Sequence, residues 1–300
     1  MTTIPYLFAR ALFKRRRELT PDVLKKMASV SVDDPYFKVD YANYQRYELA
    51  TDWPSVFTHP CYLQMASLPM QFALIMHKSS PFKALGLVHI HNQITQQPSL
   101  VQGQPFSLKV AFGKVYSHKK GVAFEVVVTA GQGGKCVYEA IGTYLERRAK
   151  FQSEYLPACE HLPLIDDNEK KPRRTLKDKH FSTNAGRHYA SISGDYNPIH
   201  LSAISAKLFG FKRAIAHGMF SMACGLSIEE EMLDFRHPDE PIVVKCDFFK
   251  AILLPSMVKV QSGPLRMDRL IFMSQTLDAE ENYLVIQYYR GEAARLHRGL

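Results

Sequence analysis

The chain has 300 residues, of which 46% are hydrophobic and 22% are charged, and its formal net charge at neutral pH is +9. This length and composition are typical of a globular protein with one large domain or two compact ones, and they exclude a disordered chain. No apolar run reaches the ~18 residues that a membrane-spanning helix needs. The positive charge favours acidic partners, such as phosphate-bearing ligands, an acidic carrier protein or nucleic acid.

Much of the positive charge lies in two runs, KRRR at residues 14–17 and EKKPRRTLKDK at residues 169–179. Neither run alternates with aromatic residues that would stack on bases, so we do not expect nucleic-acid binding. The N-terminal segment MTTIPYLFARALFKRRRELT lacks the apolar core of a secretory signal. The five cysteines are scattered and form no CxxC pair, which argues against a disulfide framework or a structural zinc site. We therefore expect a cytoplasmic protein.

Apolar periodicity predicts the same order of elements in each half of the chain. In the first half, a helix begins in FTHPCYLQMASL (residues 57–68), and the strand-like runs LGLVHIHNQI, FSLKVAFGKVYS, GVAFEVVVTA and CVYEAIGTYLE follow. The glycine-rich GQGGK (residues 131–135) lacks the spacing of a phosphate-binding loop, so we interpret it as a hairpin turn between two strands.

In the second half, a helix begins in IAHGMFSMACGL (residues 215–226), and PIVVKCDFF, SMVKVQSG, LIFMSQTL and YLVIQYYRG follow as strands. His59 precedes Val88 by 29 residues, and His217 precedes Val244 by 27 residues, so the two halves match in spacing. A long helix followed by an antiparallel meander is an α+β pattern. We expect two duplicated units that pack as an intramolecular pseudo-dimer, and a further homodimer stays open.

Between the halves, apolar periodicity fades while prolines and charges cluster, which indicates a linker. The predicted organisation is an N-terminal unit over residues 1–150, a linker over residues 151–179 and a C-terminal unit over residues 180–300.

The stretch SGDYNPIH (residues 193–200) places an acid and a base five positions apart around an Asn-Pro turn. Gly194 ends a preceding helix, and Pro198 prevents the helix from continuing through Asn197. A rigid turn of this kind can direct Asp195 and His200 toward one point. The alternative is that these side chains make local turn hydrogen bonds and cap the next helix.

The sequence AHGMFSMACGLSIEEEML (residues 216–233) follows this turn after a short segment and places a glycine at the start of an apolar helix. A helix start offers unpaired N–H groups and the positive end of the helix dipole, and a glycine there lets a ligand approach closely. A substrate oxygen that accumulates negative charge during a reaction would need such donors. Simple core packing of the helix satisfies the same apolar positions.

Taken together, DYNPIH and AHGMF resemble the hydratase signature of the MaoC-like, (R)-specific enoyl-CoA hydratases. The resemblance covers roughly residues 181–289, and HP at residues 59–60 with LGLVHIHNQI is similar to the degenerate first half of double-hot-dog members. It implies a double hot-dog fold, in which each unit is a long helix wrapped by an antiparallel sheet.

The resemblance also implies roles for individual residues. Asp195 and His200 would jointly hold and activate a water, and the backbone amide of Gly218 would bind the thioester oxyanion. Asn197 and His217 would support this geometry. The reaction implied is the interconversion of trans-2-enoyl and (R)-3-hydroxyacyl thioesters, without a metal or a redox cofactor. Coenzyme A or the phosphopantetheine of an acyl carrier protein would enter as part of the substrate.

The first half departs from this pattern. Asp52 lies 7 residues before His59, whereas Asp195 lies 22 residues before His217, and the 15 missing residues include the position of the catalytic histidine. We infer that the first unit is catalytically silent and helps to form the acyl-binding cavity. Asp52 is then either a relic of the motif or a helix N-cap.

Three basic residues near the signature, Lys212, Arg213 and Lys250, are candidate contacts for the phosphates of the substrate. His89 and His91 lie on one face of a predicted strand, but no third ligand accompanies them, so we expect no metal site. Two alternative functions stay open. One is a hot-dog thioesterase, which would direct water to the carbonyl carbon, and the other is a non-catalytic protein that binds acyl thioesters.

Overall fold

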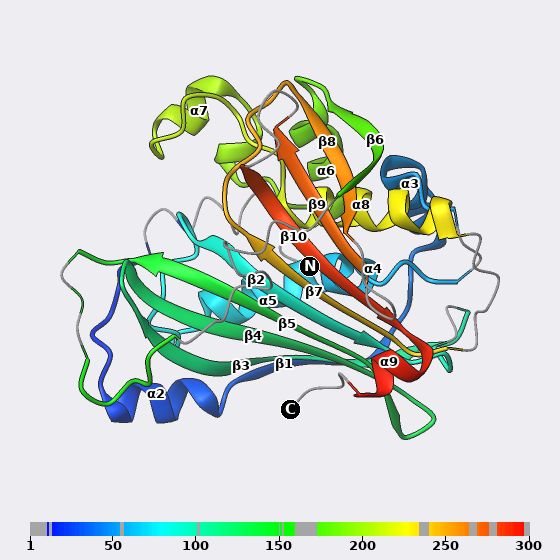
Figure 1. The fold of residues 1–300 in the computed structure, drawn as a ribbon. Helices are drawn as coiled ribbons and strands as arrows, with labels where there is room; N and C mark the ends of the chain where they lie inside the picture. Colours follow the sequence, from blue (N-terminus) through cyan, green and yellow to red (C-terminus); the bar gives the residue numbers. More distant parts are fainter. Residues whose placement is uncertain are drawn as a thin grey trace.

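The computed structural model describes residues 11, 14–54, 57–100, 103–149, 151, 153–159, 173–233, 240–263, 269–275 and 281–296. In these residues the chain forms one ten-stranded antiparallel sheet with helices on it, as the predicted α+β class requires (Figure 1). The order of strands across the sheet is β1-β3-β4-β5-β2-β7-β10-β9-β8-β6. The strands are β1 (Ser31–Phe37), β2 (Val88–Gln96), β3 (Phe106–His118), β4 (Gly121–Gln132), β5 (Lys135–Arg147), β6 (Arg174–Phe181), β7 (Ile242–Phe248), β8 (Ser256–Gly263), β9 (Arg269–Gln275) and β10 (Asn282–Arg290).

The two halves of the sheet have matching topologies. Read inward from either edge, each half presents the first, third, fourth and fifth of its own strands and then the second. The halves join where β2 pairs antiparallel with β7, with Ile94 opposite Val244. The predicted order of one helix and four strands is thus confirmed in both halves, and the fold is a double hot-dog.

Each half also contains an edge strand that the sequence patterns did not reveal. In the first half, β1 pairs with β3, and in the second half, β6 pairs with β8. The sequences of these strands, SVDDPYF and RTLKDKHF, are charged, and β1 contains a proline. Charges and prolines are tolerated at sheet edges because one side of the strand lacks a partner, so the apolar alternation of a central strand is missing. β6 covers the end of the predicted linker, and the proposed domain boundaries stay a prediction.

The helices are α2 (Pro21–Ala28), α3 (Tyr41–Thr51), α4 (Tyr62–Ala66), α5 (Leu68–Met76), α6 (Ala185–Ser193), the 3₁₀ turn η1 (Pro198–His200), α7 (Ala203–Lys207), α8 (Gly218–Leu233) and α9 (Gly291–Leu296). The predicted helix of the second half is α8, which packs against β6, β8, β9 and β10. The predicted helix of the first half is divided into α4 and α5 at Ser67. Pro69 lies in the first turn of α5, where its missing N–H is tolerated, and it prevents one continuous helix.

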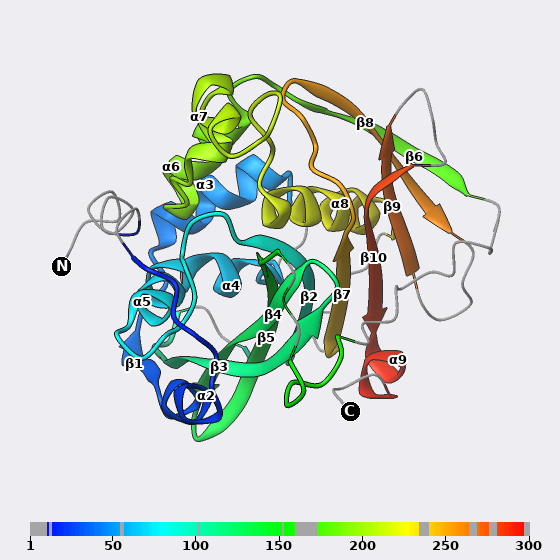
Figure 2. The same ribbon diagram turned by 90° about the vertical axis from the view of Figure 1, so that its left-hand side faces the viewer.

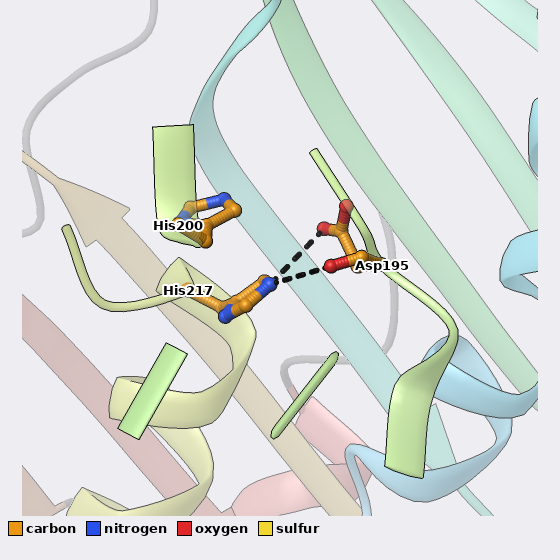
Figure 3. Close-up of side chains that lie close together, drawn as sticks. All are labelled: Asp195, His200 and His217. Atoms are coloured by element: carbon orange, nitrogen blue, oxygen red, sulfur yellow. Dashed lines mark hydrogen bonds and ion pairs between the residues drawn. The ribbon is translucent and has the colours of Figure 1, made fainter. Parts of the chain in front are cut away.

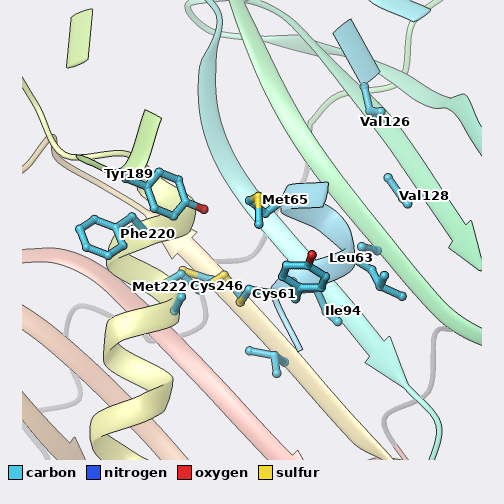
Figure 4. Close-up of a cluster of buried hydrophobic side chains, with 14 of the residues drawn as sticks. Cys61, Leu63, Met65, Ile94, Val126, Val128, Tyr189, Phe220, Met222 and Cys246 are labelled. Atoms are coloured by element: carbon cyan, nitrogen blue, oxygen red, sulfur yellow. The ribbon is translucent and has the colours of Figure 1, made fainter. Parts of the chain in front are cut away.

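The strands curve around these helices, with α8 inside the second half and α4 and α5 inside the first (Figure 2). The interior between them is one continuous apolar core to which both halves contribute. Cys61 and Ile94 of the first half lie near Met222 and Cys246 of the second (Figure 4). Burial of these side chains stabilises both units together, at roughly 25 cal/mol per Å² of apolar surface removed from water.

Polar contacts also connect the two halves. The side chain of Asn43 on α3 donates to the carbonyl of Ile192 on α6 at 2.8 Å, and Lys179 of β6 binds the Asp52 carboxylate at 2.7 Å. Asp52 is the left-handed C-cap of α3, with φ 55°. The interpretation of Asp52 as an N-cap was therefore wrong, because the helix ends at this residue and does not begin there.

Several smaller expectations can be compared with the structure. GQGGK forms the β4–β5 hairpin, with Gly133 and Gly134 at positive φ as a tight hairpin turn requires. Cys61, Cys136, Cys224 and Cys246 lie in the described residues and form no disulfide there. Among the described residues, no helix is long and apolar enough to cross a membrane.

Candidate active site

The turn that the sequence singles out has a geometry fixed by its own side chains. α6 ends at Gly194, which adopts the left-handed conformation with φ 75°. The Asn197 N–H donates to Asp195 Oδ1 at 3.2 Å, and Asn197 Oδ1 accepts from the Ile199 N–H at 3.4 Å. Local turn hydrogen bonds are therefore present, as the alternative interpretation expected. They use only one carboxylate oxygen of Asp195, whose side chain is 27% exposed and lines a cavity.

His200 is held in one tautomer by a backbone contact. Its Nδ1 lies 2.8 Å from the carbonyl oxygen of Ile215, and because a carbonyl only accepts, Nδ1 carries the proton. Burial and the neighbouring ring of His217 lower the pKa of His200 to about 3, while the Asp195 carboxylate opposes this effect. The imidazole is therefore neutral at physiological pH, and its Nε2 lone pair is available as a base.

His217 connects the turn to α8 (Figure 3). Its Nε2 donates to the backbone carbonyl of Asp195 at 3.0 Å and lies 3.8 Å from the carboxylate Oδ2 of the same residue. Its ring stacks on that of His200 at a centroid distance of 3.7 Å. Burial lowers the pKa of His217 to about 4, so at neutral pH the contact with the carboxylate is not an ion pair. His217 therefore fixes the positions of both members of the predicted dyad.

Gly218 is the first residue of α8, and it also lines the cavity. The first N–H groups of a helix have no acceptor within it, so they can donate to a bound ligand. The ring of Phe248 lies 3.1 Å from the point where a Cβ on residue 218 would stand. A side chain at residue 218 would require this ring to shift by a few tenths of an ångström, so glycine fits the close packing at the start of α8.

The cavity that these residues line has a volume of about 420 Å³, within the range of small-molecule sites. Most of its wall is apolar, and both halves of the chain contribute to it. From the first half come side chains of α4, α5, β2 and β5, among them Gln64, Met65, Leu68, Phe72, His89, Tyr144 and Arg147. The sequence analysis named none of these as binding residues, since no local motif marks them, and it considered His89 only for a metal site that it did not expect.

The histidine that aligns with His217 in the first half is packed away from this cavity. His59 is fully buried, its Nδ1 accepts from the Cys61 N–H at 3.0 Å, and its Nε2 lies 3.3 Å from the Ala223 carbonyl. It is absent from the cavity wall, and the inference that the first unit is catalytically silent stays a prediction.

Of the three candidate phosphate contacts, one lies at the cavity and two lie away from it. Lys250 lines the cavity and is paired with Glu281 at 2.6 Å. Lys212 and Arg213 are exposed and do not line the cavity, so they are not brought together with the dyad. Arg147 of β5, which the sequence analysis missed, is an exposed cation on the cavity wall.

Three side chains of the site are of types that bind metals. Asp195, His200 and His217 can each place one ligand atom within 4.8 Å of the other two. The ligands of a tetrahedral zinc ion lie about 3.3 Å apart, and one nitrogen of each ring already donates to a carbonyl. The prediction that the reaction needs no metal is not tested by this geometry. His89 and His91 have other contacts: His89 stacks on Tyr144 at 4.6 Å, and His91 Nδ1 lies 2.8 Å from Asp247 Oδ1.

The fold and this site define a double-hot-dog protein with an Asp/His turn at a shared cavity. Residues 166–278 match the family described as "MaoC like domain". A segment of 191 residues is 29% identical to 3-hydroxyacyl-thioester dehydratase X of Mycobacterium tuberculosis, covering 63% of this chain and 64% of that protein. A segment of 125 residues is 30% identical to fatty acid synthase subunit beta of Aspergillus oryzae, covering 41% of this chain and 6% of that protein.

Solved structures agree on the fold. HtdX of Mycobacterium tuberculosis superposes with a TM-score of 0.72 at 23% identity, covering 86% of this chain and 99% of that one. A MaoC-like dehydratase from Phytophthora capsici has a TM-score of 0.68 at 16% identity, covering 91% of this chain and 99% of that one. The chain therefore has the double hot-dog fold of these structures, and its residues 166–278 are similar to the MaoC-like domain.

Proposed function

We propose that this protein is a hydro-lyase that interconverts trans-2-enoyl and (R)-3-hydroxyacyl thioesters. The observation that carries the proposal is the neutral imidazole of His200, which has a ring nitrogen within 4.8 Å of an Asp195 carboxylate oxygen at a cavity that also contains the start of α8. The names of the sequence relatives, a 3-hydroxyacyl-thioester dehydratase and a fatty acid synthase subunit, support it.

In the proposed hydration, a water lies between His200 Nε2 and the Asp195 carboxylate. His200 accepts a proton as the water oxygen forms its bond to Cβ, and the π electrons move toward the thioester carbonyl. The Gly218 N–H and the positive end of the α8 dipole stabilise the resulting enolate oxygen. The imidazolium then returns the proton to Cα, so that one water is added in total. Dehydration follows the same steps in reverse.

Each of the other residues has a supporting part in this proposal. Asn197 fixes one carboxylate oxygen of Asp195, and His217 holds the Asp195 backbone and the ring of His200. Lys250 and Arg147 are the cations on the cavity wall that can meet phosphates of coenzyme A or phosphopantetheine. Lys212 and Arg213 do not line the cavity, so they can contact only phosphates on a part of the substrate that extends beyond it. A cytoplasmic location and a further homodimer remain predictions.

The first test is turnover of trans-2-enoyl-CoA of short, medium and long chain, followed by loss of the enoyl-thioester ultraviolet absorbance. Asp195→Asn and His200→Ala should each lower kcat/KM by at least about 10²-fold with the fold retained, since both groups act on the proton of water. Unchanged turnover in both variants would contradict the assignment.

A thiol reagent in the same assay distinguishes the two alternative functions. Release of free coenzyme A without hydration would indicate a thioesterase. Binding of the thioester without either product, on coenzyme A and on carrier-protein substrates alike, would indicate a non-catalytic binding protein.

A further inference from the structure

The turn that carries the dyad continues into an exposed lobe, residues 201–213, which contains α7. Ile204 and Leu208 of this lobe are each 81% exposed. They are four residues apart on one helical turn, so their side chains project from the same side of it. A single exposed apolar side chain needs no explanation, whereas two neighbours on one turn form a continuous apolar patch.

The lobe is held firmly on the dyad turn. The Ser205 hydroxyl donates to the Pro198 carbonyl at 2.7 Å, and the Phe211 N–H donates to the Ala206 carbonyl at 3.2 Å. The side chain of Ala206, on the opposite side of α7 from the patch, is fully buried. This short helix therefore buries one side and exposes the other, so the position of the patch is set by the fold.

Basic side chains surround the patch. Lys207, Lys212 and Arg213 of the lobe are exposed. Arg187 of α6 is also exposed, and its guanidinium donates to a carbonyl of the lobe at 2.7 Å. No aspartate or glutamate occurs in residues 196–228. The lobe therefore combines apolar tips with a local excess of positive charge.

The lobe lies beside the cavity. Phe209 and Phe211 line the cavity wall, and the lobe begins directly after His200. α7 lies at the outer edge of the molecule in both views (Figures 1 and 2). A surface that binds the lobe would therefore lie close to the cavity.

We propose that the lobe docks this protein on an anionic lipid surface. Ile204 and Leu208 enter the interfacial region, which apolar side chains of bound helices reach to a depth of roughly 5–10 Å. Lys207, Lys212 and Arg213 stay at the level of the lipid phosphates, where the negative surface potential attracts each cation. Because the lobe contains no carboxylate, no repulsion from the lipid headgroups opposes this attraction.

The form of the lobe favours a lipid surface over a protein partner. A specific protein interface uses roughly 20 to 30 residues on each side and has a closely packed centre. The lobe offers two aliphatic tips on a short turn, and a fluid interface accepts such tips without a complementary pocket. If the proposed function holds, docking also brings the cavity next to a bilayer, into which long acyl chains partition.

The test is co-sedimentation of the purified protein with vesicles of phosphatidylcholine alone or of an equimolar mixture of phosphatidylcholine and phosphatidylglycerol. Wild type should bind the anionic vesicles at least about 10-fold more tightly than the neutral ones, and added salt should weaken this binding because it screens surface charge. The measurement requires no turnover, so the docking and the proposed function can fail separately.

Two variants examine the apolar and the basic parts of the lobe. Ile204→Ser combined with Leu208→Ser should lower the partition constant for anionic vesicles by about 10-fold or more, since the apolar tips are lost. Lys207→Gln, Lys212→Gln and Arg213→Gln together should lower it by about 10²-fold and reduce its salt dependence.

Matched controls change equally exposed side chains elsewhere. Leu49→Ser replaces an aliphatic side chain of α3 that is 79% exposed and follows the acidic Glu48. Lys114→Gln, Lys119→Gln and Lys120→Gln together remove three exposed cations from β3 and the β3–β4 hairpin. Both controls should keep the wild-type preference for anionic vesicles. Urea midpoints equal to that of wild type establish that every variant is folded.

Four outcomes would overturn the docking. Wild type binds neither kind of vesicle, or it binds both equally. The lobe variants bind anionic vesicles as tightly as wild type. The lobe and control variants lose binding equally, which would indicate general attraction of a basic protein. In the fourth, a purified acyl carrier protein binds wild type and loses affinity in the lobe variants while vesicles do not bind, so the lobe would be a protein-docking surface.

Discussion

At the scale of single residues, the chemistry of the site depends on which ring nitrogen carries a proton. The Ile215 carbonyl assigns the proton of His200 to Nδ1, and the Asp195 carbonyl assigns that of His217 to Nε2. The segment around Ile215 is itself held by hydrogen bonds from the Ala216 N–H to the Ile252 carbonyl and from the Leu254 N–H to the Ala214 carbonyl. The orientation of the His200 ring thus depends on three parts of the chain: its own turn, the segment around Ile215, and the segment of Ile252 and Leu254.

The low pKa of His200 predicts the pH dependence of the reaction. The active form of the base is the neutral ring, and a folded pKa of about 3 keeps it neutral well below the ordinary value of 6.5. We expect kcat/KM to show no acidic inflection between pH 5 and 8, because this parameter reports the free enzyme. Initial rates after brief exposure to each pH, with activity restored on return to pH 7, check this. A midpoint between pH 6 and 7 would show that the imidazole is solvated.

At the scale of elements, the turn after α6 determines where the dyad lies. Gly194 adopts φ 75°, which a residue with a Cβ adopts only under strain, and the next residue is Asp195. The left-handed conformation of Gly194 therefore both ends α6 and sets the position of the Asp195 carboxylate.

Replacement of Gly194 should lower both stability and activity, and a control glycine in a hairpin distinguishes the two effects. We expect Gly194→Ala to lower the free energy of unfolding by about 1 kcal/mol and also to reduce kcat, because relief of the strain shifts the Asp195 backbone. Gly134→Ala in the β4–β5 hairpin, where φ is 74° and nothing lies near the added Cβ, is the matched control. Urea unfolding and enoyl-CoA turnover of both variants decide the matter. An equal loss of kcat in the two would show that activity follows stability alone.

At the scale of the whole molecule, the two halves share one sheet, one core and one cavity. The β2–β7 pairing joins the halves, and contacts such as Asn43 with Ile192 hold α3 of the first half against α6, which leads into the dyad turn. The first half is thus part of the site although it contributes no second Asp/His turn.

Burial of neutral histidines across both halves predicts acid sensitivity of the whole fold. The pKa values of His59, His200 and His217 are lowered by burial to about 3, 3 and 4. Because the unfolded chain protonates these rings near pH 6.5 while the folded chain does not, stability is lost as pH falls below that value. Each ring contributes up to about 1.4 kcal/mol per pH unit within this window.

Urea midpoints at pH 7 and pH 5 measure this loss. We expect a clearly lower midpoint at pH 5, and a smaller difference in His59→Gln, which removes one of the three buried rings without altering the cavity wall. An equal midpoint at the two pH values would contradict the burial of these histidines as neutral groups.

The sequence by itself determined the parts of this protein that depend on local pattern. Alternating apolar residues defined the central strands, the apolar run after His217 defined α8, and glycine and proline around Asp195 defined the turn. Each signal lies within a few residues of the structure that it specifies, since strand alternation and turn conformation are local properties. The edge strands β1 and β6 were not predicted, because edge positions do not require apolar alternation.

Only the tertiary structure decided which distant residues share the cavity. Gln64, Tyr144 and Arg147 line the same cavity as the dyad because β2 pairs with β7 and the sheet curves around the helices of both halves. The Ile215 and Asp195 carbonyls fixed the histidine tautomers, and the fold left Lys212 and Arg213 outside the cavity. No local pattern encodes these outcomes, because they arise from packing between separate elements of the chain.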